Sequence, residues 1–251
     1  MSPLALSMII FLFTLAGIGL GALLRAKLPK QHLDKDSQDV VKLGVGLVAT
    51  IGALVLGLLI ASAKASFDTQ SNQVRQITAD VILLDNLLAE FGPEALPIRQ
   101  GMRAAIGAFA DKLWREKEEK SNAPFAATAA AEQVYRGVYA LPAHTDLQRS
   151  LQARAMQVAN DMTQIRLLLF VESGSVIPAP FLAVLVFWLV IIFASFTLFA
   201  PMNPTVFAAL CLFALSASAA IFLILELSQP FGGLIQISSV PLRTALAPLS
   251  P

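Results

Sequence analysis

The longest stretch without a charged residue runs from Ser173 to Leu225, and its 53 positions contain no Asp, Glu, Lys, Arg or His. A helix needs about 20 mostly apolar residues to cross the hydrocarbon core of a bilayer. This stretch therefore has room for two spans, and the Ala-Pro-Met-Asn-Pro segment at 200–204 supplies a turn between them. Residues 3–24 and 43–63 are also uncharged, and each fits one further span. We predict four membrane-spanning helices, at about 4–24, 43–63, 180–200 and 205–226.

Composition supports this prediction. Hydrophobic residues make up 56% of the 251 residues and charged residues 14%, against about 45–50% and 25% in a soluble domain. So few charges would not cover a soluble globule, which favours an integral protein of the lipid bilayer. The net charge of +1 gives no basic surface, so nucleic acid is not an expected partner. The single cysteine, Cys211, excludes an intrachain disulfide.

The first apolar stretch could instead be a signal peptide, which has a basic start and a shorter apolar core. Residues 1–7 contain no Lys or Arg and the stretch has full length, so we expect a retained anchor. Four spans place both termini and residues 64–172 on one side and the connector 25–42 on the other. Five basic residues in the connector face four near the opposite membrane surface, so the positive-inside rule does not choose an orientation.

Residues 64–172 hold 25 of the 35 charged residues, 12 basic and 13 acidic, as expected for a water-exposed domain. A heptad seam at the start of this segment predicts a helix that continues the second span without a break and stops at Gly92-Pro93. Further helices are expected at about 94–120, around Val134 and Val138, and from a cap at Thr145 or Asp146 to about Leu169. The seam consists of Phe67, Val74, Ile77, Val81, Leu84, Leu88 and Phe91.

The predicted fold is all-α: a polytopic membrane protein with a helical soluble domain inserted between the second and third spans. We expect a first helix pair at 1–63 with the polar connector 25–42, the soluble domain at 64–175, a second helix pair at 176–226, and a C-terminal tail at 227–251.

The sequence offers no catalytic set. The two histidines, His32 and His144, have no carboxylate at metal-ligand spacing, and no HExxH, GxSxG, Walker or GxGxxG motif occurs. Apart from Glu226 at the end of the fourth, the predicted spans contain no Asp, Glu, Lys, Arg or His. We therefore expect no enzyme activity, no metal site and no cofactor.

The second predicted span carries two stripes at i, i+4 spacing. One consists of small residues, which let helices approach closely in lipid, either within a subunit or between several subunits. The other has hydroxyls at its ends and leucines in its middle. It would form a hydrophobic constriction if it faced water, or its hydroxyls could bond their own helix. The stripes are Ala49, Ala53, Gly57 and Ala61, and Thr50, Leu54, Leu58 and Ser62.

Two further features lie at the membrane edge and beyond it. Lys64 and Glu226 end the second and fourth spans on the same side, where they could pair with each other or reach water separately. A turn of Pro230, Phe231, Gly232 and Gly233 cannot continue the fourth span. The apolar tail that follows is expected to pack on the soluble domain or on a neighbouring subunit, with Arg243 on its polar side; its apolar residues are Val240, Leu242, Leu246 and Leu249.

Several segments resemble the bacterial bestrophin-like membrane proteins. They are Asp39–Gly44, Ala53–Lys64, Leu83-Leu84-Asp85, Phe91–Ala95, Pro180-Phe181, Phe187-Trp188 and Glu226–Ile235. The chain is also similar, more distantly, to the bestrophins, which are pentameric anion channels with four spans per subunit and a helical cytosolic domain. Their second span lines the pore, and a Val-Leu-Gly in its neck resembles Val55-Leu56-Gly57. This resemblance implies neck positions at Thr50, Leu54 and Leu58, without the aromatic residues usual there.

Two functions remain open. The first is a homo-oligomeric ion channel for a small anion or another ion, with a pentamer favoured and the second span lining the pore. The second is a non-conducting scaffold or sensor whose helical domain binds a partner. The resemblance implies the inner membrane of a bacterium with the soluble domain in the cytoplasm.

Overall fold

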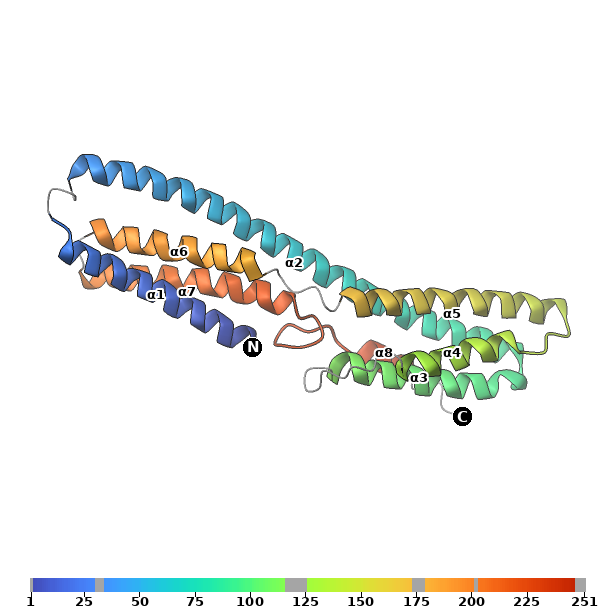
Figure 1. The fold of residues 1–251 in the computed structure, drawn as a ribbon. Coiled ribbons are helices and arrows are strands. Elements are labelled where there is room, and N and C mark those ends of the chain that lie inside the picture. The colour runs from blue at the N-terminus through green and yellow to red at the C-terminus, as the bar shows by residue number, and fades with distance from the viewer. Residues whose placement is uncertain (1, 30–33, 116–125, 173–178, 201–202, 247–251) are drawn as a thin grey trace. The chain divides into compact units, whose positions relative to one another are not determined.

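The computed structural model describes residues 2–29, 34–115, 126–172, 179–200 and 203–246, and this part of the chain is helical with no β-strand. The elements appear in Figure 1 with the labels used below. They are α1 (Pro3–Lys27), α2 (Lys35–Phe91), the 3-10 helix η2 (Pro93–Ala95), α3 (Leu96–Arg115), α4 (Ala126–Tyr139), α5 (Asp146–Glu172), α6 (Ala179–Phe199), α7 (Pro204–Leu227) and α8 (Val240–Ala245).

Four helices of the described chain, α1, α2, α6 and α7, are long and apolar enough to cross a membrane. This confirms the four candidate spans and the all-helical class. The second candidate span lies inside α2, a continuous helix of 57 residues, as the absence of Pro and Gly after residue 57 predicted. The helix ends at the expected place, because Gly92 has φ 128°, a backbone conformation that residues other than glycine rarely adopt.

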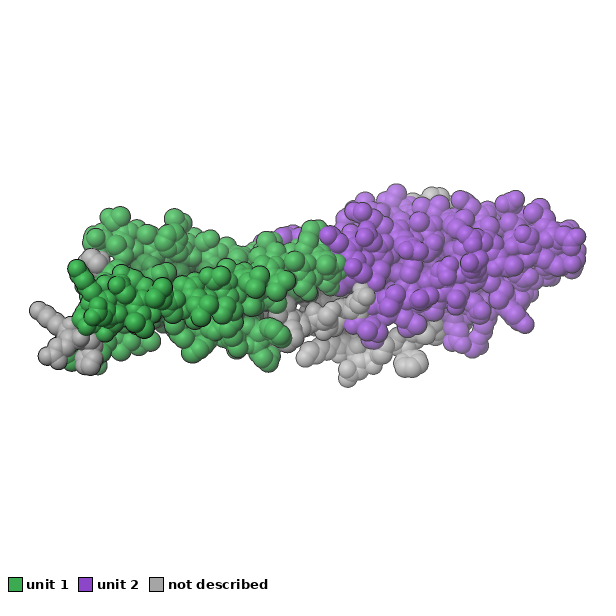
Figure 2. All heavy atoms as spheres, turned by 90° about the horizontal axis from the view of Figure 1, so that it is seen from above, with its two compact units in different colours: residues 1–67, 176–228 green, residues 68–175, 229–251 purple. Residues whose placement is uncertain are grey.

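The chain divides into two compact units, coloured separately in Figure 2. Unit 1 comprises residues 1–67 and 176–228, and unit 2 comprises residues 68–175 and 229–251. The predicted domain limits at 63/64 and 175/176 stay predictions, although the unit boundaries fall close to them.

Unit 1 is a bundle of α1, α6, α7 and the first part of α2. One buried cluster joins Ile10 of α1, Leu185 of α6 and Ile221 of α7, with Leu56 and Leu59 of α2 packed against it. A second joins the same three helices further along at Ile18, Phe193, Leu210 and Ala214. Each helix therefore presents one apolar face to its neighbours and another to the surroundings.

The closest approach in unit 1 is between α1 and α6, and it uses a Gly-x-x-x-Gly pair that our sequence reasoning did not single out. A Cβ on Gly17 would lie 2.9 Å from the Val190 carbonyl oxygen, and one on Gly21 would collide with the Ala194 carbonyl oxygen and the Thr197 hydroxyl. Thr197 is fully buried and donates to the Ile18 carbonyl oxygen at 3.0 Å. The four-residue glycine spacing in an apolar segment was the available signal.

The ends of the unit 1 helices are capped by side chains. The Ser2 hydroxyl accepts from the Ala5 N–H at 3.2 Å, and the Asn203 side chain accepts from the Val206 N–H at 2.8 Å. At the other end of α1, the Arg25 guanidinium donates to the Ala200 carbonyl, just beyond the end of α6. These bonds satisfy backbone groups that a helix end leaves without an intrahelical partner.

Unit 2 is built around the predicted heptad seam. Val74, Ile77, Val81, Leu84, Leu88 and Phe91 are all buried, which confirms the seam over this part of α2. Met102 and Phe109 of α3 and Val138 of α4 complete the core, together with Leu169 of α5. Tyr135 and Tyr139, the next residues after Val134 and Val138, are exposed.

Two polar features fix the helix ends and crossings of unit 2. Asp85 of α2 accepts two hydrogen bonds from Arg99 of α3, at 2.6 and 3.0 Å, and this bond to Asp85 raises the pKa of Arg99.

The Thr145 hydroxyl accepts from the Gln148 N–H at 3.1 Å, while the Gln148 side chain accepts from the Thr145 and His144 N–H groups. This reciprocal arrangement is a capping box, and it identifies Thr145 as the cap of α5.

Candidate functional site

The candidate pore-lining residues lie on an uncovered face of α2. Leu54 and Leu58 expose 65% and 62% of their surface, and Thr50 and Ser62 are exposed as well. The Thr50 hydroxyl donates to the Gly46 carbonyl oxygen at 2.9 Å, so this hydroxyl bonds its own helix. Within the described part of the chain no other helix covers these four side chains, so they are open to lipid, water or another protein.

The stripe of small residues on α2 is also uncovered. Ala53, Gly57 and Ala61 are exposed, and Ala49 is half-buried. A Cβ placed on Gly57 would meet no atom within 4 Å. The described helices therefore leave most of this stripe uncovered, and its role in close helix packing stays a prediction.

The opposite face of α2 does pack within unit 1. Ala63 lies in a buried cluster with Ile224 and Leu227 of α7, against which Leu56, Leu59 and Ile60 also pack. A Cβ on Gly52 would lie 3.7 Å from the Trp188 ring of α6. These contacts fix the rotation of α2 about its own axis, so that Leu54 and Leu58 turn away from the other three helices.

α2 is the least covered of the four candidate spans. Only 11% of its most apolar 18-residue window is buried within the chain, against 17% in α6 and 28% in both α1 and α7. A groove of about 430 Å³ separates its first turns from the last turns of α6, between residues such as Gln38, Lys42, Phe196 and Phe199. The α2 span is thus attached on one side and incompletely packed at its N-terminal end.

Glu226 and Lys64 lie at the end of α7 and within α2. Glu226 is 3% exposed, and its neighbours Leu225 and Leu227 are buried in the clusters that join α7 to α2. The Lys64 ammonium lies 5.6 Å from the centre of the Phe67 ring, in a cation–π contact. The Ala63 cluster brings both segments together, and an ion pair between Lys64 and Glu226 stays a prediction.

The tail after α7 folds back within unit 2. The Gly232 N–H donates to the Gln229 carbonyl at 3.1 Å, the Ile237 N–H donates to the Pro230 carbonyl at 2.7 Å, and Gly233 has φ 102°. The Phe231 ring meets the Trp114 ring edge-on, with their centres 5.5 Å apart. The sequence predicted the turn at Pro230, Phe231, Gly232 and Gly233, but it did not predict the contact with Trp114.

The structure places the tail on α3 of unit 2, within the segment that we predict to be the soluble domain. The Trp114 indole N–H donates to the Ile237 carbonyl oxygen at 2.8 Å, and Arg243 of α8 donates to Asp111 of α3 at 2.7 Å. Leu242 and Leu246 are buried, while Val240 remains exposed and Leu249 lies outside the described residues.

The described residues contain no group of three or more His, Cys, Asp or Glu side chains that could hold a metal ion. The candidate site is a surface, the exposed face of α2, and its side chains are apolar or carry hydroxyls.

Comparison with known proteins identifies the family. A family model described as a bestrophin-like domain matches residues 11–242. A crystal structure of a variant bacterial bestrophin homolog from Klebsiella pneumoniae superimposes with a TM-score of 0.70 at 12% identity, covering 96% of this chain and 97% of that one. Another variant of that homolog gives a TM-score of 0.69 at 13% identity, covering 99% and 97%. No curated protein matches the chain.

The fold and the surface together define an all-helical membrane protein with four helices long and apolar enough to span a bilayer. The chain belongs to the bestrophin-like family, as its sequence motifs indicated.

Proposed function

We propose that this protein is the subunit of a homo-oligomeric ion channel in which the uncovered face of α2 lines the pore. The observation that carries the proposal is the exposure of Leu54 and Leu58 on a helix whose other face is packed. Membership of the bestrophin-like family and the likeness to bacterial bestrophin homologs support it.

In this proposal several copies, five being favoured, surround one axis. The exposed small residues Ala53, Gly57 and Ala61 let neighbouring copies approach closely. A ring of leucines at positions 54 and 58 then forms a narrow apolar constriction, which excludes water because its walls offer no replacement hydrogen bonds. Thr50 and Ser62 supply polar groups on either side of it.

The proposal includes an arrangement in the bacterial inner membrane. Residues 64–175 form a soluble domain inserted between the second and third spans and lie in the cytoplasm, and a small anion or another ion crosses the bilayer. At the membrane edge, Lys64 and Glu226 form an ion pair, which would offset the cost of burying the Glu226 carboxylate.

Ion flux into vesicles reconstituted with the purified protein tests the channel. Leu54→Ala, Leu58→Ala and Leu54→Ser should each widen or wet the constriction and raise the flux. Leu212→Ala is the matched control, because Leu212 of α7 is 63% exposed but lies on another helix, and its flux should equal that of the original protein. Flux no higher than in empty vesicles for the original protein and for all four variants, at varied pH and voltage, would refute the channel.

A non-conducting scaffold or sensor is the second candidate. It is favoured by two large side chains exposed near the connection between α4 and α5, Tyr139 at 71% and Leu147 at 60%, which a partner protein could cover. Particle symmetry distinguishes the two functions: a closed ring with α2 at its axis favours the channel, and a monomer or dimer favours the scaffold.

A further inference from the structure

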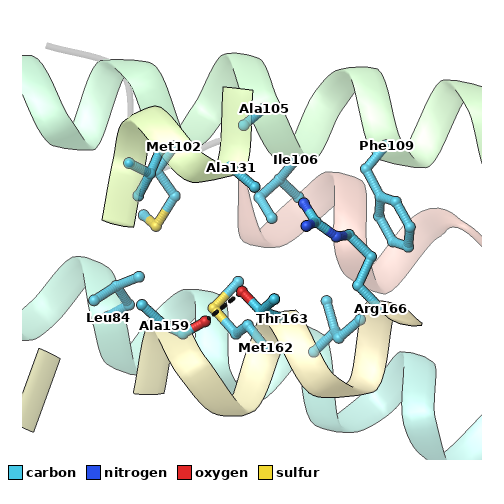
Figure 3. Close-up of a pocket in the computed structure, with 12 residues that line it drawn as sticks. Leu84, Met102, Ala105, Ile106, Phe109, Ala131, Ala159, Met162, Thr163 and Arg166 are labelled. Carbon is cyan, nitrogen blue, oxygen red and sulfur yellow. Dashed lines mark hydrogen bonds between the residues drawn. The ribbon is translucent and has the colours of Figure 1, made fainter. Parts of the chain in front are cut away.

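The core of unit 2 is not completely filled. A cavity of about 40 Å³ lies between α2, α3, α4 and α5, with walls that include Leu84, Met102, Phe109 and Met162 (Figure 3). This is more room than one water molecule requires, yet most of the wall is apolar and offers a water few hydrogen bonds. The two methionines have flexible side chains that can move to admit a larger apolar group.

One cation enters this apolar wall. Arg166 extends from α5 towards Ile106 and Phe109 of α3, so its guanidinium lies at the cavity rather than in open solvent (Figure 3). Burial lowers the pKa of Arg166, which means that its surroundings disfavour the charged form. A guanidinium has five N–H donors, and it can therefore keep its contacts within the protein and still bind an incoming anion.

A second hollow adjoins the first. It measures about 230 Å³ and shares Ala131, Thr163 and Arg166 with the apolar cavity. Its other walls are polar, with Tyr135 and Glu132 of α4 and Asn160 of α5. The Glu132 carboxylate is bonded to Arg136 at 2.6 Å, and this pairing offsets its charge. Arg166 is thus the cation at the junction between a polar hollow and an apolar one.

We propose that these two hollows form a binding site for a linear medium-chain carboxylate. The carboxylate binds the Arg166 guanidinium from the polar side, with Tyr135 and Asn160 as further donors. The acyl chain enters the apolar cavity and displaces the Met102 and Met162 side chains. The site lies wholly within unit 2 and does not depend on whether the protein conducts ions.

Octanoate is the probe, added to the full chain in lipid nanodiscs with methyl-labelled methionine. The NMR signals of Met102 and Met162, assigned from the Met102→Leu and Met162→Leu variants, should shift saturably with octanoate. The signal of Met8, which is 53% exposed on α1, reports uptake into the bilayer and should not follow the same curve. Acetate and octan-1-ol each lack one half of the ligand and should bind much more weakly.

Three variants distinguish binding at this site from binding elsewhere. Arg166→Gln should raise the apparent Kd for octanoate about tenfold or more, since bonds to charged groups are the strong ones. Arg149→Gln, which removes an exposed arginine of the same helix, should leave the Kd unchanged. Ala105→Leu fills the cavity without touching a charge and should abolish the shifts. Equal shifts with octan-1-ol, or a Kd unaffected by Arg166→Gln in a folded protein, would overturn the proposal.

Discussion

Gly21 and Gly19 lie two residues apart on α1 and have opposite surroundings. Space for a Cβ at Gly21 is already taken by backbone and side-chain oxygens of α6, whereas a Cβ at Gly19 would meet nothing within 4 Å. We expect Gly21→Ala to force α1 and α6 apart and to cost about 1–3 kcal/mol, as overpacking does. Gly19→Ala should be neutral or slightly stabilising, because alanine favours the helix. Thermal unfolding in detergent checks both, and equal melting temperatures would contradict the close approach.

Thr197 offers a second residue-scale test of the same contact. Its hydroxyl lies 3.0 Å from the Ile18 carbonyl oxygen across the helix pair and also 3.0 Å from the Ala194 carbonyl oxygen of its own helix, and the side chain is fully buried. Thr197→Val keeps the shape and removes the donor. The expected loss is about 0.6 kcal/mol, the average for such bonds in membranes, and at most about 1.7 kcal/mol. Thermal or chemical unfolding measures it, and a larger loss would mean that the bond supports more than this one contact.

Asp80 of α2 shows how burial affects an acid in unit 2. One of its carboxylate oxygens is buried without a hydrogen-bond partner, and its pKa is raised by burial and by the nearby charge of Asp161, against a smaller opposing effect of Arg154. The folded state therefore holds this proton more tightly than the unfolded state. Between the two pKa values stability falls as the pH rises, and the penalty is present in full above the raised pKa.

Asp80→Asn should accordingly raise the melting temperature at pH 7 and have less effect, or the opposite effect, near pH 4. Asp161→Asn, in a protein that keeps Asp80, should raise the melting temperature at pH 7 by less. This substitution removes the neighbouring negative charge, but Asp80 remains buried. Melting curves at both pH values measure the two changes. A loss of stability at pH 7 in Asp80→Asn would show that the charged carboxylate is favoured in the folded state.

At the scale of elements, the contacts that hold the tail to α3 contribute unequally to its stability. The Trp114 indole bond to Ile237 and the ring contact with Phe231 are partly buried, while the Arg243–Asp111 pair is half-exposed. We expect Trp114→Phe to cost about 0.5–1.5 kcal/mol for the lost donor. Arg243→Gln should cost less than about 1 kcal/mol, because water already weakens that pair. Limited proteolysis of the tail ranks the two variants, and the reverse order would contradict this assignment.

Removal of residues 230–251 tests the whole tail. The truncation exposes Trp114 and the α3 surface that Leu242 and Leu246 cover, and the melting temperature of the assembled protein should fall. If the truncated protein assembles and melts like the full chain, the tail contributes nothing to stability.

The long helices and the seam of unit 2 could be predicted from the sequence because they depend on local patterns. A span needs length and apolarity, and a seam needs a seven-residue repeat, so α2 and its stop at Gly92 follow from neighbouring residues alone. The pairing of α1 with α6 could not be predicted in this way. Gly17 and Gly21 are visible in the sequence, but the sequence does not say which helix packs against them. The partner of Trp114, Ile237, lies 123 residues further along the chain and was missed for the same reason.

The candidate site shows the same division. Spacing alone placed Thr50, Leu54, Leu58 and Ser62 on one stripe. It did not fix which way that stripe points, since the rotation of α2 is set by Trp188, Ile224 and Leu227, more than a hundred residues away.

For the whole molecule, the uncovered face of α2 predicts contacts between copies. In a Cys211→Ser background, Ala53→Cys should form cross-links between subunits with a short thiol reagent, because the small-residue stripe brings neighbouring helices close. Leu12→Cys is the control, since Leu12 is 57% exposed on α1, outside the proposed contact. Gel mobility after cross-linking gives the result. Equal cross-linking at both positions, or none at Ala53→Cys, would argue against the assembly proposed here.

The contact between α1 and α6 also sets an order of events during synthesis. Its hydrogen bonds join residues 175 and 179 positions apart, from Arg25 to Ala200 and from Thr197 to Ile18. At about 5–20 residues per second, α1 leaves the ribosome roughly 10–40 seconds before α6 is complete. During that interval the flat glycine surface of α1 has only lipid, or another protein of the membrane, against it. α1 is thus locked in place only after α6 has been made, and variants at Gly17 or Gly21 should reduce the yield of folded protein in cells more than their effect on the finished molecule would suggest.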